Sequence, residues 1–249
     1  MNSLLAIDAG NTRTKWAVLH GETGAVLAHG VLSDDTIPTA WQHCDRVAVA
    51  NVAGKAQHVF LEHQLRTLGV LVRWHTSTVQ AAGLVNGYTQ PEQLGVDRWA
   101  SMVAAWQYYQ RSCLVVNAGT ALTVDMIEQT AAGQARFIGG IIMPGMRLMQ
   151  TSIGNAAAGI VQGSGVFQDF PLNTQDAVYS GSLYALSGAV DNLLQVLGEH
   201  CGQIVPCMLS GGDATALLPL LHKHVLAREY HLEQNLVLQG LWYLEREYS

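Results

Sequence analysis

The sequence predicts an α/β protein that contains two similar domains. Three observations carry this prediction. Three short apolar runs separated by turns open the chain, helical and extended segments then alternate, and a strand–turn–strand pattern near the start recurs after residue 112. The 249 residues suffice for one large or two smaller domains, so we place the domains at 1–112 and 113–249. The final helix could pack back on the first domain.

Composition limits the class of protein. Hydrophobic residues make up 49% and charged residues 13%, which is typical of a compact globular chain. The net charge of −6 and the lack of a Lys/Arg cluster argue against a nucleic-acid partner. No stretch approaches the roughly 20 apolar residues of a membrane span. The N-terminus has no secretion signal and the four cysteines form no C-x-x-C pair, so we expect a reduced, cytoplasmic protein.

Residues 4–19 carry the clearest chemical pattern. An apolar run ends at Asp8, a polar turn with Gly10 follows, and a second alternating run begins near Thr14. Gly10 lets the backbone bend sharply and lets an anion approach its N–H groups. Further donors and a positive charge come from Asn11, Thr12, Thr14 and Lys15. This cradle beside the Asp8 carboxylate suits a nucleotide phosphate with Mg²⁺, although an ordinary hairpin with a polar turn gives the same pattern.

The remaining elements of the first domain follow from periodicity and turn residues. A turn at 20–24 and a short strand at 25–28 complete an antiparallel meander. The segments that follow are a short helix at 36–42, a strand at 46–51, a helix at 56–68, a strand at 70–74, a loop at 86–91 and a helix at about 99–109.

A strand at 113–116 then leads into a second copy of the opening pattern. The segment Asn117-Ala118-Gly119-Thr120-Ala121-Leu122-Thr123 matches Asp8-Ala9-Gly10-Asn11-Thr12-Arg13-Thr14 at Ala, Gly and the last Thr. A strand at 136–142 and later helices and a strand repeat the order of elements. The pattern indicates a duplication that gives two similar domains facing each other across a cleft. Coincidence between two short turns is the alternative.

The second half continues with alternating elements. They are a helix that reaches about residue 157, a loop at 159–165, a long helix at 174–197, a strand at 206–209, a further helix, and an amphipathic helix at 232–248. The long helix carries many small residues, which predicts close packing against another element or a second subunit. The Gly211-Gly212 turn after the strand at 206–209 could let a flat base lie against the backbone.

Taken together, these motifs resemble those of the type III pantothenate kinases, within the actin, Hsp70 and sugar-kinase superfamily. The resemblance covers essentially the whole chain. It is carried by Asp8 to Lys15, Tyr88 with Pro91, Gly95-Val96-Asp97-Arg98, Asn117 to Thr123, Gly139-Gly140 through Pro144-Gly145, and Asn173-Thr174. It implies two ribonuclease-H-like (actin-like) domains with mixed β-sheets flanked by helices. It also implies an enzyme that uses ATP with Mg²⁺ to phosphorylate pantothenate, the first step toward coenzyme A.

The resemblance assigns roles to individual residues. Asp97 would accept the proton of the pantothenate hydroxyl, and Arg98 would bind the pantothenate carboxylate. Pantothenate would also contact Tyr88, Gly95, Val96 and Thr174, and the ATP phosphates would contact Asp8, Gly10, Asn11, Thr12, Thr14, Lys15 and Thr120. Asp8 would hold Mg²⁺ through the phosphates. Members of the family are homodimers. Without the resemblance, each of these residues has an ordinary structural explanation. Asp97-Arg98 is consistent with an acidic helix start beside a surface arginine, and a Tyr in a loop is usually a packing residue. Thr174 is consistent with a helix N-cap.

One position departs from the family pattern. Where the family commonly has an Asp that helps bind K⁺ or NH₄⁺, this chain has Asn117, which keeps a carbonyl ligand but loses the charge. Strand alternation places Asp125 on the same face as Thr123, so Asp125 is a candidate replacement. The monovalent-cation site is therefore open to question.

Two other functions stay open at the level of sequence. One is a nucleotide-binding transcriptional accessory protein with a kinase fold, and the other is a kinase for a different small hydroxy acid. The Asp97-Arg98 pair favours an enzyme, because a regulator needs no proton acceptor.

Overall fold

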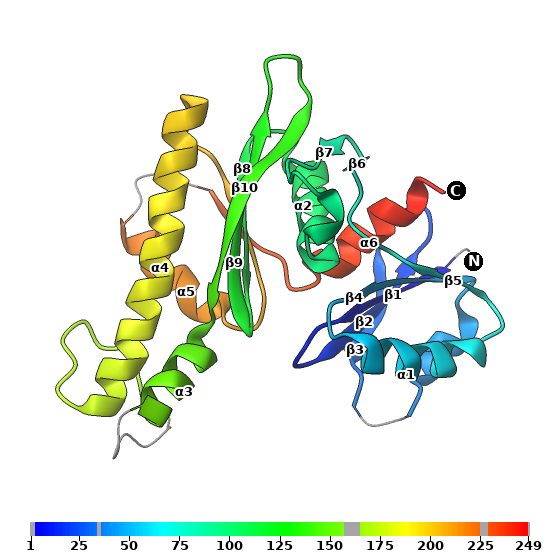
Figure 1. The fold of residues 1–249 in the computed structure, drawn as a ribbon, viewed down its shortest axis with the longest axis horizontal. Helices are drawn as coiled ribbons and strands as arrows, with labels where there is room; N and C mark the ends of the chain where they lie inside the picture. Colours follow the sequence, from blue (N-terminus) through cyan, green and yellow to red (C-terminus); the bar gives the residue numbers. More distant parts are fainter. Residues whose placement is uncertain (1–2, 34–35, 157–164, 225–228, 249) are drawn as a thin grey trace. The chain divides into compact units, whose positions relative to one another are not determined.

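The computed structural model describes residues 3–33, 36–156, 165–224 and 229–248, and Figure 1 shows their elements. The chain divides into two compact units. Unit 1 consists of Met1–Arg111, Gln129–Ile138 and Asn235–Ser249, and unit 2 of Ser112–Glu128 and Gly139–Gln234. The chain thus leaves unit 1 close to the predicted boundary at residue 112 and returns to it twice, the second time with the final helix.

Unit 1 is built on a five-stranded mixed sheet with the order β3-β2-β1-β4-β5. The pairs β1–β2 and β2–β3 are antiparallel, whereas the pairs β1–β4 and β4–β5 are parallel. The strands are β1 (Ser3–Ala9), β2 (Thr14–His20), β3 (Val26–Val31), β4 (Arg46–Asn51) and β5 (Leu71–Trp74). The first three form the predicted meander, because each is a short run rich in apolar residues and consecutive runs are joined by a turn.

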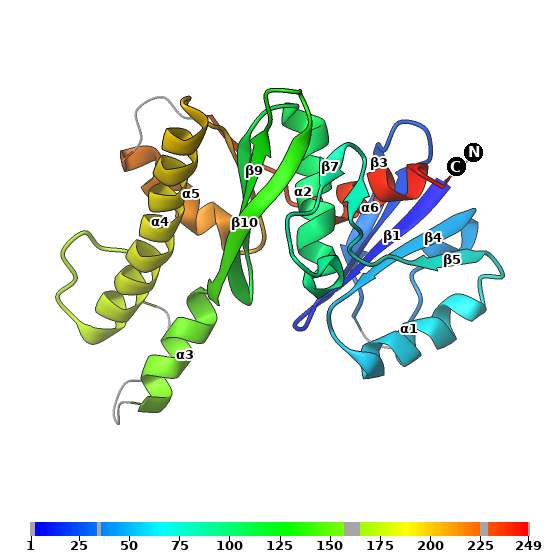
Figure 2. The same cartoon turned by 45° about the horizontal axis from the view of Figure 1, so that its top comes forward.

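Helices cover both faces of this sheet (Figures 1 and 2). Leu5 and Ile7 of β1 pack with Leu61 and Leu65 of α1 (Lys55–Arg66) in one buried cluster. The other face carries α2 (Val96–Tyr109) and α6 (Leu236–Arg246), which pack on each other and on β4. Gly240 makes that contact possible, because a Cβ atom there would lie 1.9 Å from the carbonyl oxygen of Ala100.

Small elements complete unit 1. They are the 3₁₀ turns η1 (Thr39–His43) and η2 (Pro91–Gln93) and the two-residue strands β6 (Gln80–Ala81) and β7 (Leu84–Val85). The strand β7 pairs in parallel with Ala135 and Arg136 at the start of β10 (Ala135–Pro144). The hairpin formed by β6 and β7 therefore lies at the edge of a sheet, beside the loop that leads to α2.

Unit 2 repeats the strand order of unit 1. Its strands are β8 (Cys113–Ala118), β9 (Ala121–Gln129), β10, β11 (Cys207–Ser210) and β12 (Tyr230–Leu232), and its helices are α3 (Met146–Ala156), α4 (Thr174–Cys201) and α5 (Ala214–His224). The order β10-β9-β8-β11-β12 corresponds to β3-β2-β1-β4-β5, again with two parallel pairings after the meander. The predicted fold class, an α/β protein with two similar units, is therefore confirmed.

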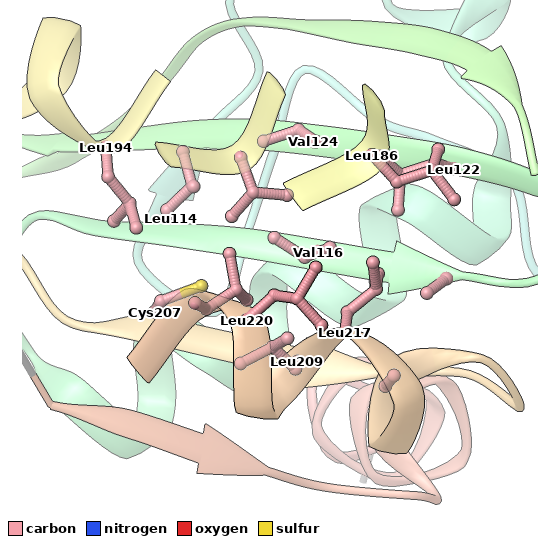
Figure 3. Packing of buried hydrophobic residues seen from close by; sticks show 14 of the residues in the cluster. Leu114, Val116, Leu122, Val124, Leu186, Leu194, Cys207, Leu209, Leu217 and Leu220 are labelled. Carbon is pink, nitrogen blue, oxygen red and sulfur yellow. The ribbon is translucent and has the colours of Figure 1, made fainter. Parts of the chain in front are cut away.

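The core of unit 2 lies between its sheet and its helices, as Figure 3 shows. Leu114 and Val116 of β8 are fully buried against Leu186 and Leu194 of α4 and Leu217 of α5. Alternate side chains of a strand point to the same face of the sheet, so Leu114 and Val116 both face these helices.

Several boundaries differ from the prediction. The predicted helix at 36–42 is the 3₁₀ turn η1, and α2 begins at Val96 instead of residue 99. The final helix begins at Leu236, because Tyr230–Leu232 pairs with β11 as β12. The hairpin β6–β7 was not predicted, since two-residue strands leave no periodic signal. Residues 157–164 of the predicted loop at 159–165 lie outside the described residues.

Candidate functional site

The polar turn of unit 1 joins β1 to β2. The strands pair in register, with Asp8 opposite Lys15 and Ala9 opposite Thr14, and Gly10 N–H donates a hydrogen bond to the Arg13 carbonyl at 3.1 Å. Asn11 and Thr12 are exposed at the tip. Their side chains and backbone N–H groups are therefore accessible to an anion.

Thr14 plays a different part from its neighbours in the turn. It is only 7% exposed, and its hydroxyl accepts a hydrogen bond from Gln57 Nε2 of α1 at 3.0 Å. Gln57 thereby ties the start of β2 to α1. Gln57 could not be predicted as a support of the turn, because the contact joins elements that are far apart in the chain.

Asp8 lies near the end of the apolar strand β1. Its pKa is raised to about 7, first by burial and then by the negative charge of Asp97, while Lys15 acts in the opposite direction. Two carboxylates of unit 1 thus lie close enough to repel each other. A bound cation would relieve that repulsion, and carboxylate oxygen is the ligand that Mg²⁺ prefers.

No group of three or more His, Cys, Asp or Glu side chains in the described part of the chain could hold a metal ion by itself. A divalent ion at Asp8 would therefore complete its shell with phosphate oxygens and water. This is the usual arrangement for Mg²⁺ in enzymes that act on nucleotides.

The start of α2 holds the candidate proton acceptor. Gly95 is the N-cap, Val96 is buried, and Asp97 lies in the first turn, where the helix dipole favours a negative charge. Asp97 Oδ1 accepts a hydrogen bond from the Arg98 N–H at 2.8 Å. Burial raises the pKa of Asp97, and the hydrogen bond and charge of Arg98 oppose this shift. A Cβ atom on residue 95 would lie 2.6 Å from Asp97 Oδ1, so glycine leaves room for the carboxylate.

Arg98 is 5% exposed and lies among aromatic groups. Its Nη1 donates a hydrogen bond to the Tyr88 hydroxyl at 3.0 Å, and its guanidinium carbon lies 5.8 Å from the Tyr88 ring centre and 5.9 Å from that of Phe137. The two rings are 5.3 Å apart. Phe137 was not among the predicted site residues, because a single Phe in a strand looks like an ordinary core residue. Tyr88 and Phe137 therefore hold the planar guanidinium of Arg98 in a fixed orientation.

The second polar turn belongs to unit 2. Gly119 N–H donates a hydrogen bond to Ala121 O, and Gly145 N–H donates to Thr120 O, both at 3.0 Å. A Cβ atom on residue 145 would lie 2.0 Å from Gly119 O. Gly211 has φ +98°, and a Cβ atom there would lie 2.1 Å from Ala118 O. The backbone segments around Gly119, Gly145 and Gly211 therefore pack closely together at the end of β8. Thr120 is exposed beside them.

The candidate cation ligands lie on the paired strands of unit 2. Asn117 stands opposite Thr123, and Asp125 stands opposite Val115 two residues further along β9. Asp125 is fully buried. The hydroxyl oxygen of Thr123 is buried and has no hydrogen-bond partner within the described residues. These residues are oxygen donors, but a cation site at this position stays a prediction.

Thr174 is exposed at the first position of α4 in unit 2. It is not the N-cap, because Asn173 holds that position and its Oδ1 accepts a hydrogen bond from the Asp176 N–H at 2.9 Å. Thr174 therefore does not cap α4. It lines a shallow, open surface depression of about 570 Å³ together with Ile153, Leu172 and Gly181.

The structure therefore sorts the predicted site residues into two groups. Unit 1 holds Asp8, Gly10, Asn11, Thr12, Thr14, Lys15, Tyr88, Gly95, Val96, Asp97 and Arg98, and unit 2 holds Asn117, Thr120, Asp125 and Thr174. Within unit 1, the end of β1 and the start of α2 lie close enough for the negative charge of Asp97 to raise the pKa of Asp8.

Comparison with known proteins gives a consistent result. A model of the family described as type III pantothenate kinase matches residues 4–196. A type III pantothenate kinase from Methylobacillus flagellatus is 68% identical over 246 residues and covers 99% of both chains. One from Nitrosospira multiformis is 37% identical over 250 residues and covers 99% of this chain and 92% of its own.

Solved structures resemble the fold at low identity. A ROK family glucokinase from Streptomyces griseus, solved with glucose and AMPPNP, has a TM-score of 0.56 at 12% identity and covers 99% of this chain and 100% of its own. A Campylobacter jejuni protein assigned to the Baf family of transcriptional activators has a TM-score of 0.61 at 18% identity and covers 98% of both chains. These likenesses support the fold alone.

Proposed function

Because the chain belongs to the type III pantothenate kinase family, we propose that the start of α2 carries its reaction. The protein is an enzyme that transfers a phosphoryl group from ATP to pantothenate, which gives 4'-phosphopantothenate in the first step of coenzyme A biosynthesis. The observation that carries the residue assignment is the placement of Asp97 beside both Arg98 and Asp8.

Asp97 accepts the proton of the attacking pantothenate hydroxyl. Its carboxylate is held over the first turn of α2, and the raised pKa makes it a stronger base than an exposed aspartate. Arg98 binds the pantothenate carboxylate with its planar guanidinium, whose orientation is fixed by Tyr88. Gly95 and Val96 supply the backbone that the substrate lies against, and Thr174 is a further contact.

The phosphates of ATP bind at the turn of unit 1. Gly10, Asn11 and Thr12 offer backbone and side-chain donors, and Lys15 adds a positive charge opposite Asp8. Thr14 holds the turn in place through Gln57. The family resemblance adds Thr120, at the matching turn of unit 2, to the residues proposed to bind phosphate. Asp8 would hold Mg²⁺ through the phosphates, and the metal would neutralise charge on the transferred group.

A monovalent cation, K⁺ or NH₄⁺, would bind weakly at Asn117. Asn117 offers a neutral carbonyl oxygen, and the buried carboxylate of Asp125 on the next strand is the candidate for the missing charge. Affinity for a hard cation rises with the number of charged ligands, so the neutral Asn117 side chain should bind it weakly.

The active form is a homodimer that is assembled through α4. Gly181, Ala185 and Gly188 are exposed along one side of this helix. A Cβ atom at Gly181 or Gly188 would meet nothing within 4 Å, so packing within the described chain does not require glycine there. Leu172, which is 98% exposed, lies just before the helix. A second copy of α4 is the partner that such a face suits.

The enzyme works in the cytoplasm without nucleic-acid or membrane partners. None of the four cysteines, Cys44, Cys113, Cys201 and Cys207, forms a disulfide in the part of the chain that the structure describes, which supports a reducing compartment. The net charge of −6 disfavours binding to nucleic acid. Among the described helices, none has the length and apolar character that a membrane span needs.

A coupled ADP-release assay with pantothenate, glucose and a panel of other small hydroxy compounds tests the substrate. We expect turnover with pantothenate alone and a product of the mass of 4'-phosphopantothenate. Turnover confined to a sugar would reassign the substrate. ATP binding without any turnover would favour the alternative of a nucleotide-binding accessory factor, which the family assignment does not favour.

A further inference from the structure

The Tyr88–Arg98 pair depends on a buried side chain that lies outside the predicted site. Asn86 is 6% exposed and stands at the start of the loop that leads to α2. Its Nδ2 donates hydrogen bonds to the carbonyls of Thr78 at 3.1 Å and Pro91 at 3.3 Å. Its Oδ1 accepts a hydrogen bond from the Tyr88 N–H at 3.0 Å. Both donors and one acceptor of this amide are therefore used.

The three bonds join three parts of the loop. Thr78 belongs to the segment after β5, whose Val79 carbonyl also accepts the Asn86 N–H at 2.8 Å. Pro91 begins η2, and Tyr88 stands between the two. A Cβ atom on Gly87 would lie 1.9 Å from Phe137 O, so the loop is also pressed against β10 at this point. The position of the Tyr88 backbone is thus set by Asn86 on one side and by β10 on the other.

Tyr88 passes this constraint to Arg98. Its hydroxyl accepts the hydrogen bond from Arg98 Nη1, and its ring lies against that of Phe137 with the ring centres 5.3 Å apart. A shift of the Tyr88 backbone moves the hydroxyl that orients the guanidinium. Recognition of a carboxylate by a planar fork of donors depends on that orientation.

We propose that Asn86 is a positioning residue for the carboxylate-binding arginine and acts on Arg98 through Tyr88. Asn86 does not touch the substrate. It sets the affinity for pantothenate and leaves the ATP site and the proton acceptor unchanged. This proposal rests on the proposed role of Arg98.

The first experiment compares Asn86→Ala with Gln107→Ala. Gln107 is a matched control, because its Nε2 also donates to a backbone carbonyl, that of Ala82 at 2.7 Å, near the other end of α2. We expect Asn86→Ala to raise the KM for pantothenate on the order of tenfold, the size expected when a hydrogen bond to a charged group weakens. The KM for ATP should stay unchanged and kcat should change much less. Gln107→Ala should leave both KM values unchanged at a comparable loss of thermal stability.

A double-mutant cycle separates positioning from general destabilisation. Tyr88→Phe removes the hydroxyl that Arg98 contacts and keeps the ring. If Asn86 acts through that hydroxyl, Asn86→Ala should add little to the pantothenate KM in the Tyr88→Phe background. Additive effects on KM, or equal rises for ATP and pantothenate, would overturn the proposal. If Asn86→Ala gives no folded protein, Asn86→Ser replaces it in the same cycle, since its hydroxyl can donate to one of the two carbonyls.

Arg98→Ala separates the proposed role of Asn86 from the proposed role of Arg98. If Arg98→Ala raises the pantothenate KM and Asn86→Ala does not, the role of Asn86 is wrong and the proposed role of Arg98 stands. If Arg98→Ala leaves the pantothenate KM unchanged, both are wrong.

Discussion

Asp97 and Arg98 are adjacent in sequence but face different surroundings. Asp97 folds back over the helix start, where its Oδ1 accepts the next backbone N–H, while Arg98 extends to the rings of Tyr88 and Phe137. One turn of helix therefore holds both the proposed base and the proposed carboxylate-binding cation in fixed positions. Gly95 is a condition for this arrangement, because a side chain there would collide with the Asp97 carboxylate.

The motifs predicted these two residues, but their supports could not be found from sequence. Asn86, Gln57 and Phe137 act through contacts that depend on how the chain folds, and none belongs to a recognisable motif. Thr14 shows the reverse case. It belongs to the motif, yet its hydroxyl is buried against Gln57, so its part is to hold the turn.

The cation site gives a prediction at the residue scale. We expect Asn117→Asp to make turnover more dependent on potassium than in the wild type, because the new carboxylate adds a charge to a set of oxygen ligands. Potassium chloride is titrated into both proteins at fixed ionic strength, with an organic cation as the balance. Asn117→Ser, which has a hydroxyl and no charge, is the control. A steep potassium requirement in the wild type would contradict the prediction and point to Asp125 as a sufficient ligand.

At the scale of elements, the C-terminal helix is tied to the sheet of unit 1 by a buried ion cluster. Glu245 of α6 is 2% exposed, and its Oε2 lies 3.0 Å from both Arg73 Nε of β5 and His75 Nε2. Burial acts to raise the pKa of Glu245, but the hydrogen bond from His75 and the charges of Arg73, His75 and Arg46 outweigh it, so the pKa is lowered. The ionised form is thus preferred in the folded state.

This cluster predicts a pH-dependent stability. Because the folded pKa lies below the unfolded value, the contribution of Glu245 is complete above the unfolded pKa and is lost as pH falls through the folded pKa. Glu245→Gln should lower the free energy of unfolding at neutral pH by roughly 2–3 kcal/mol, the scale of hydrogen bonds to a charged group. Urea unfolding of the wild type and of Glu245→Gln is measured from pH 7 to pH 3. The difference between their free energies of unfolding should become smaller as the pH falls.

Glu62→Gln is the control for this measurement. Glu62 pairs with Arg66 at 3.0 Å on the exposed side of α1, where both side chains are well exposed. A surface pair of this kind contributes little to stability. If the difference between Glu245→Gln and the wild type did not change with pH, the ionised Glu245 would not be the stabilising form.

Sequence reasoning located most elements but not their ends. Periodicity predicted the strands that surround both turns, since each alternates or is continuously apolar. The start of α2 was placed three residues too late, because Gly95 offers no side-chain cap and the apolar repeat becomes clear only at Trp99. The strands β6 and β7 are two residues each and exist through pairing alone.

At the scale of the whole molecule, the two units are variations on one plan. Both have a meander followed by two parallel strands in the same order, with a polar turn after the first strand. The motif match between the two turns anticipated this repeat. The turn of unit 1 keeps Asp8 where unit 2 has Asn117, so the two turns have diverged in charge.

The homodimer proposal gives a prediction at this scale. Ala185→Arg places a long charged side chain on the exposed stripe of small residues of α4 and should convert the dimer to a monomer. Light scattering after size-exclusion chromatography measures the mass. Val59→Arg, at a position of α1 that is 55% exposed, should leave the mass unchanged. A wild type with the mass of one 26.9 kDa chain would contradict the proposal.

The central claim is that Asp97 accepts the proton during transfer from ATP to pantothenate. Its most direct test is the rate of 4'-phosphopantothenate formation by Asp97→Asn at saturating ATP and pantothenate, with ATP binding and thermal unfolding measured on the same preparation. The asparagine keeps the shape of the side chain and an oxygen for the Arg98 N–H but cannot take up the proton. We predict a folded variant that binds ATP normally and turns over about 10²–10⁴-fold more slowly. Turnover near the wild-type rate would contradict the claim.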